Sequence, residues 1–118
     1  MDLDLVHRLL IYHLDDSISV PFAVSPELLP DFDSTKCFES TNAQDFRDAY
    51  QALLAAEPMP ETNPNINSRW GMIFMGNAGN TLISAYMDSF GVRGIIDDKA
   101  VAFKYPALLR WLTARLST

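Results

Sequence analysis

Apolar and polar positions in the first 40 residues predict a hairpin followed by a loop. Residues 6–14 form a compact apolar run rich in β-formers, and residues 15–17, Asp-Asp-Ser, carry turn-forming side chains. In residues 18–24, apolar and small or polar side chains alternate with the period of a half-buried strand. Pro21 lacks a ladder donor, which favours a sheet edge for this second strand. Residues 25–39 have no clear period, and we expect an acidic loop with at most one helical turn at 26–29.

The pattern then changes to that of an amphipathic helix. Thr41 and Gln44 have the spacing of a capping box. In this motif the Thr41 side chain accepts from the backbone amide of Gln44, and the Gln44 side chain reaches back to the backbone amide of Thr41. An apolar stripe follows at helical spacing, and Glu57-Pro58 is expected to end the helix. The stripe consists of Phe46, Ala49, Tyr50, Leu53 and Leu54. Residues 59–68 are rich in Pro and Asn and are predicted to be a connecting loop.

The second half has the pattern of a meander closed by a helix. Strands are predicted at 69–75 and 81–87, joined by the turn Gly-Asn-Ala-Gly-Asn at 76–80. A short segment ending in Ile95-Ile96 leads through the Asp97-Asp98 turn to a strand at 99–103. Pro106 suits a first helical position, and Leu108, Leu109, Leu112 and Leu116 make one apolar stripe.

These elements predict an α+β fold. We expect an antiparallel sheet of five to six strands with two helices packed on one face, in the order ββαβββ(β)α. The length of 118 residues and the 48% hydrophobic content suit one packed domain, so residues 1–118 are expected to form a single α+β domain.

Charge is distributed unevenly along the chain, whose net charge is −6. The first 61 residues hold twelve acidic side chains and three basic ones, whereas the remainder holds three acids against six bases. A segregated acidic field attracts cationic partners and repels nucleic acid and anionic lipid. We therefore expect no nucleic-acid partner and no membrane partner.

Motifs of catalysis or metal binding are not found. The chain has no nucleophile elbow, phosphate-binding loop or dinucleotide fingerprint, and no zinc-ligand spacing, so no enzyme activity, cofactor or metal is expected. His7 and His13 are interpreted as partly exposed histidines at the ends of a strand, and Asp15-Asp16 and Asp97-Asp98 as turn residues. Cys37 is interpreted as a small buried hydrophobe, and a single cysteine cannot form an internal disulfide.

Carboxylates and aromatic rings are mixed in the predicted loop and the opening of the first helix. Carboxylates around aromatic anchors suit a site for a basic protein surface, because charge raises the association rate and buried rings hold the complex. The predicted partner-binding residues are Asp31, Phe32, Asp33, Phe38, Glu39, Asp45 and Asp48. A plainer interpretation, a solvated acidic surface without a partner, stays open.

The start of the chain is acidic where a secretory signal is basic, and no stretch approaches the roughly 18 apolar residues of a membrane span. We therefore expect a cytoplasmic protein, monomeric or weakly dimeric.

In size, charge and outline the chain resembles the immunity proteins of bacterial polymorphic toxin systems, which include contact-dependent inhibition, Rhs and type VI secretion systems. The resemblance covers the ββα plus meander order, with Arg69-Trp70-Gly71-Met72, Gly91-Val92-Arg93-Gly94 and the closing 108–112 helix. It implies a cytoplasmic inhibitor that binds and occludes a toxin domain. It assigns no interface residue, so the seven residues named above rest on the charge argument alone.

The sequence thus predicts an inhibitor of a cognate basic toxin domain, with a nuclease as the expected target. One alternative is a phage-type inhibitor of a nucleic-acid machine, which would also present acid to a basic channel. A second is a small enzyme or ligand-binding domain with a pocket lined by His7, His13 or Cys37.

Overall fold

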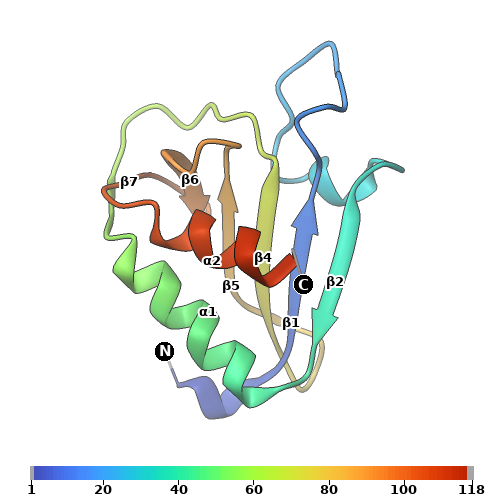
Figure 1. The fold of residues 1–118 in the computed structure, drawn as a ribbon. Helices are drawn as coiled ribbons and strands as arrows, with labels where there is room; N and C mark the ends of the chain where they lie inside the picture. The colour runs from blue at the N-terminus through green and yellow to red at the C-terminus, as the bar shows by residue number, and fades with distance from the viewer. Residues whose placement is uncertain (1, 117–118) are drawn as a thin grey trace.

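The computed structural model describes residues 2–116 as an α+β fold built on one seven-stranded antiparallel sheet (Figure 1). The spatial order of the strands is β2-β1-β4-β5-β6-β7-β3, so β2 and β3 are the two edges. The strands are β1 (Val6–His13), β2 (Lys36–Ser40), β3 (Pro58–Pro60), β4 (Trp70–Gly76), β5 (Thr81–Met87), β6 (Arg93–Ile96) and β7 (Lys99–Phe103). The helices are α1 (Ala43–Ala55) and α2 (Ala107–Leu116), with short 3-10 turns at Leu3–Leu5 and Leu29–Asp31.

Both helices lie on the same face of the sheet, as the sequence predicts (Figure 1). The sheet has seven strands, one more than the upper end of the prediction. The additional strand is β3, which pairs with β7 at the edge. Its two prolines hid it from the sequence pattern, but a proline is tolerated where one side of a strand has no partner.

The predicted hairpin is wrong, because residues 18–24 do not form a strand. The antiparallel partner of β1 is instead β2, from the region expected to be loop, with Ile11 opposite Phe38 and Leu9 opposite Ser40. Nearly every β2 side chain is exposed, so this edge strand carries no apolar alternation for a sequence pattern to detect.

Helix α1 begins one residue later than the capping box predicts. The cap is Asn42, whose Oδ1 accepts from the backbone N–H of Gln44 at 2.8 Å, while the Gln44 side chain turns to Asp48. The helix ends before Pro58, with Glu57 in a left-handed conformation at φ 48°. Of the predicted stripe, Leu54 is exposed and Ala52 is buried in its place.

The main core lies between the sheet and the helices. It is made by alternate residues of the central strands together with one stripe of each helix. Its largest members are Leu9, Ile11, Phe46, Leu53, Trp70, Met72, Phe74, Met87, Phe103, Leu108 and Leu112. No helix in residues 2–116 is both long enough and apolar enough to cross a bilayer.

A second, smaller core lies on the opposite face. Tyr12 and Tyr86 stand on this face, one on each side of Gly71, and pack against Leu29 of the 15–35 segment. A Cβ at position 71 would lie 3.0 Å from the Tyr86 ring and 3.4 Å from Leu29, so glycine is what lets them approach the sheet. The fully buried residues of this core are Leu14, Val24 and Leu29.

Candidate functional site

Segment 15–35 folds back over the end of the sheet and is held there by residues 67–69. The buried Arg69 donates from Nη1 to the backbone carbonyls of Asp15 and Ile18, each at 3.0 Å. Val24 donates its N–H to Asn67 Oδ1 at 2.9 Å, and its carbonyl accepts from the N–H of Ser68 at 2.7 Å. These bonds and the second core give a segment with little regular structure a fixed conformation.

An apolar pocket opens on the outer side of this segment. It is lined by Phe22, Leu28, Asp31 and Phe32, which we call the loop cluster, and has a volume of about 260 Å³. Phe22 is 50% exposed and Leu28 is 42% exposed, while the rings of Phe22 and Phe32 lie 6.1 Å apart at a tilt of 35°. Large apolar side chains gathered in the open mark a binding surface more often than scattered ones do.

Acidic side chains surround the loop cluster in sequence. Segment 15–35 contains no Lys or Arg. Its five acids, Asp15, Asp16, Glu27, Asp31 and Asp33, are all exposed. Asp15 accepts from the N–H of Ser17 at 2.8 Å, which lowers the pKa of its carboxyl, chiefly through this backbone hydrogen bond. No ion pair involves these five carboxylates within residues 2–116.

Three of the seven predicted partner-binding residues, Asp31, Phe32 and Asp33, belong to this segment. The cluster also includes Phe22 and Leu28, which are not among the predicted partner-binding residues. The sequence pattern predicts a strand around Phe22, whose ring would then face the core, and a loop without a clear period around Leu28. Phe22 and Leu28 become candidate binding residues because they are exposed in a segment whose charged side chains are all acidic. Their exposure is known only once the fold is known.

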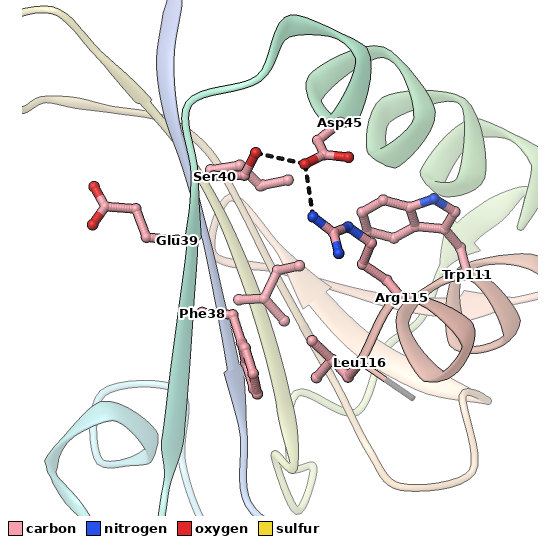
Figure 2. Close-up of a pocket in the computed structure, with 9 residues that line it drawn as sticks. Phe38, Glu39, Ser40, Asp45, Trp111, Arg115 and Leu116 are labelled. Carbon is pink, nitrogen blue, oxygen red and sulfur yellow. Dashed lines mark hydrogen bonds and ion pairs between the residues drawn. The ribbon is translucent and has the colours of Figure 1, made fainter. Parts of the chain in front are cut away.

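A groove lies on the helix-covered face between β2 and the two helices (Figure 2). Three further predicted partner-binding residues lie at it, namely Phe38, Glu39 and Asp45. The groove has a volume of about 160 Å³. Phe38, 39% exposed, lines it together with Trp111 and Leu116.

Polar contacts close one end of this groove. Asp45, in the first turn of α1, accepts from Ser40 Oγ at 2.6 Å and from Arg115 Nη2 at 3.0 Å (Figure 2). The Ser40 hydroxyl above all, and then the Arg115 guanidinium, lower the pKa of the Asp45 carboxyl. Glu39 points away from the groove and pairs with Arg8 at 3.1 Å. Asp45 therefore ties β2, α1 and α2 together.

The seven predicted residues do not form one continuous surface. Phe38 faces the helix side of the sheet, whereas segment 15–35 packs on the opposite side, and the two regions lie at different ends of β2. Asp48 belongs to neither, and its carboxylate accepts from Gln44 Nε2 at 2.8 Å. Of these two places, the loop cluster has the more exposed apolar side chains, since Phe22 and Leu28 are more open than Phe38 in the groove. Its segment also carries carboxylates without an ion-pair partner among residues 2–116, so the loop cluster is the stronger candidate for a partner site.

The residues considered for chemistry do not converge. His7 is exposed at one end of β1, while His13 at the other end stacks on Trp70 with ring centroids 3.7 Å apart. Burial lowers the pKa of His13. Residues 2–116 contain no group of three or more His, Cys, Asp or Glu side chains arranged to hold a metal.

Cys37 was expected to be buried, and this prediction is wrong. The thiol lies exposed on the edge strand β2, across from Tyr12 on β1. Partial desolvation raises the pKa of the thiol despite a hydrogen bond with Tyr12, so the thiolate, the reactive form of cysteine, is disfavoured. The Asp97-Asp98 pair occupies the turn between β6 and β7 at positive φ, as predicted.

Comparison of the chain with known protein families, curated proteins and solved structures gave no significant match. The interpretation of the site therefore rests on this chain's own residues.

Proposed function

We propose that this chain is an immunity-type inhibitor that binds a basic toxin domain, with a nuclease as the expected target, and blocks its active site. The inhibitor acts by occupying a surface and performs no chemistry of its own. The observation that carries the proposal is the loop cluster, an open set of apolar side chains on a segment that contains five acids and no Lys or Arg.

The carboxylates and the aromatic rings of segment 15–35 would contribute to binding in different ways, and both contributions support this function. Exposed carboxylates accelerate encounter with a cationic surface but add little affinity once they are solvated. Phe22 and Phe32 supply the buried contact area that holds a complex, since aromatic anchors dominate interface energetics. An inhibitor needs both, because it must reach the toxin before the toxin reaches its substrate.

The fixed conformation of the segment also favours binding. Arg69 and the second core hold the loop cluster in place before any partner arrives. A preformed surface loses less conformational entropy on association than a disordered loop does.

Affinity capture from the native host, followed by mass spectrometry, tests the proposal. The expected result is one stoichiometric protein with a basic domain, whose expression alone stops growth and whose co-expression with this chain restores it. A host polymerase or another nucleic-acid machine as the partner would favour the phage-type alternative. Absence of any stoichiometric protein partner, with a small molecule retained instead, would contradict the proposal.

A further inference from the structure

The loop cluster has the size of a pocket for one side chain. Its volume of about 260 Å³ lies below the range of roughly 300–1,000 Å³ found for pockets that hold drug-sized ligands. Its walls are the rings of Phe22 and Phe32 and the side chain of Leu28, and Asp31 is its only charged residue. An occupant should therefore be slender and apolar along its length, with a polar end.

The pocket is preformed. Leu29, fully buried, anchors the segment from below, and the N–H of Asp31 donates to the carbonyl of Leu28 at 3.0 Å. The centroids of the two rings lie 6.1 Å apart at a tilt of 35°, which is the spacing of aromatic rings in contact, so an entering group would lie against the rings and not between them. No rearrangement of the backbone is required before a side chain enters.

Charge selects the kind of occupant. The carboxylate of Asp31 has no hydrogen-bond or ion-pair partner in the part of the chain that the structure describes, and the four other acids of the segment carry the same sign. An anionic group would be repelled, whereas a cationic one would be paired. The occupant is thus a basic side chain and not a carboxylate or phosphate.

Arginine fits these walls better than lysine does. Its guanidinium is planar and weakly hydrated, stacks on aromatic rings, and pairs with a carboxylate through two parallel N–H donors. Its methylene stem covers apolar surface such as Leu28 while the head reaches the rim. Lysine offers a strongly hydrated point charge and loses more solvation when it lies against aromatic rings.

We infer that the loop cluster receives one arginine side chain of the toxin partner, with the guanidinium stacked against the rings of Phe22 and Phe32 and paired to Asp31. This inference rests on the proposed function, since it names the chemistry by which that partner is recognised.

The test uses the purified chain and three capped tripeptides, Ac-Ala-Arg-Ala-NH2, its lysine analogue and its norleucine analogue. Each is titrated while NMR follows the ring protons of Phe22 and Phe32. The arginine peptide should produce saturable shifts of both rings and bind at least threefold more tightly than the lysine peptide. The norleucine peptide should bind more weakly than either. Asp31→Asn should weaken arginine binding at least threefold.

Asp4→Asn is the matched control, because Asp4 is also exposed but lies in the 3-10 turn that precedes β1. It should leave the titration unchanged. Equal binding of the lysine peptide, shifts that do not saturate, or equal effects of Asp4→Asn and Asp31→Asn would overturn the inference. The titration uses no toxin, so its failure leaves the capture experiment to decide the proposed function independently.

Discussion

Asp45 shows how a single carboxylate organises the helix-covered groove. It accepts hydrogen bonds from Ser40 on β2 and from Arg115 on α2, while its own backbone belongs to α1. Its side chain is only 17% exposed, so these bonds are weakly screened. The position near the N-terminus of α1 also favours a negative charge.

Replacing Asp45 with Asn should lower the free energy of unfolding at neutral pH by about 1 kcal/mol, because hydrogen bonds to a charged group are stronger than neutral ones. The folded-state pKa of Asp45 is lowered, so its contribution is complete above the ordinary carboxyl range and is lost from about pH 4 downwards. Denaturant unfolding at several pH values measures this, and the variant should lose less stability than the native chain on acidification.

Asp48→Asn is the control for this measurement. Asp48 lies one turn further along α1, and its carboxylate accepts one hydrogen bond, from Gln44 Nε2 on the same helix. Its replacement should change stability by less than about 0.5 kcal/mol. An equal effect of the two substitutions would show that Asp45 contributes only as a generic helix charge.

At the residue level, the sequence predicts a conformation correctly where it depends on the local pattern. It fails where the conformation or burial of a residue depends on contacts with distant parts of the chain. Asp97 and Asp98 form the expected turn, since aspartate tolerates the backbone that a tight turn requires. The helix cap is Asn42 and not Thr41, although both residue types suit a cap, and it is the Asn42 side chain that accepts from the N–H of Gln44. The exposure of Cys37 follows from the edge position of β2, which the sequence does not encode locally.

At the level of elements, Arg69 holds the acidic segment 15–35 against the sheet. Arg69 directly precedes β4, and its guanidinium donates to the backbone carbonyls of Asp15 and Ile18. Because Arg69 is buried, breaking either hydrogen bond is costly. Arg93 makes a comparable contact elsewhere, donating to the carbonyl of Asn63 at 2.8 Å. Two arginines thus each hold a different loop of the same sheet.

Arg69→Met should release segment 15–35 and lower stability by about 1–3 kcal/mol, because the carbonyls of Asp15 and Ile18 lose their buried donor. Hydrogen–deuterium exchange should become faster in residues 15–35 and stay slow in β4 and β5. Arg93→Met should accelerate exchange near Asn63 and leave 15–35 protected. Uniform acceleration across the sheet in the Arg69 variant would contradict a local fastening role.

The elements that the sequence predicted best are those joined by short turns. β4, β5 and β7 are predicted from the turn residues that connect them, while the sequence gives β6 only as an optional strand of the meander. The prediction for the partner of β1 is wrong, because residues 18–24 alternate like a strand but pack Ile18, Val20 and Val24 into a loop core and leave Phe22 exposed. Pairing across 22 intervening residues depends on long-range contacts, which no local pattern reports.

At the scale of the whole molecule, one end of the sheet carries the acidic segment 15–35, with its loop cluster, and Arg69, which holds that segment. The sequence predicted the charge and three of the residues there, Asp31, Phe32 and Asp33, but the open pocket depends on which rings the fold leaves exposed. Asp45 is predicted as a contact residue, and the structure shows it bonded to Ser40 and Arg115 within the molecule, so its contact with a partner stays a prediction.

Association with a basic partner should slow as ionic strength rises, because charges separated by more than about 8 Å are screened at physiological salt. The effect should appear mainly in the association rate constant, with little change in the dissociation rate constant. Stopped-flow measurements with the captured partner from low to high salt determine both constants. A salt-independent association rate would remove electrostatic steering from the account.

The central claim is that segment 15–35 is the surface that meets the toxin, and charge reversal within it tests this most directly. Asp31→Lys combined with Asp33→Lys is compared with Asp2→Lys combined with Asp4→Lys, which changes the net charge equally at the N-terminal 3-10 turn. The measurement is growth of cells that co-express each variant with the toxin, at equal soluble levels of inhibitor. The account predicts that the Asp31 and Asp33 variant fails to protect, because like charges at a basic interface cost several kcal/mol, while the control protects fully. Full protection by the Asp31 and Asp33 variant, or equal loss in both, would contradict it.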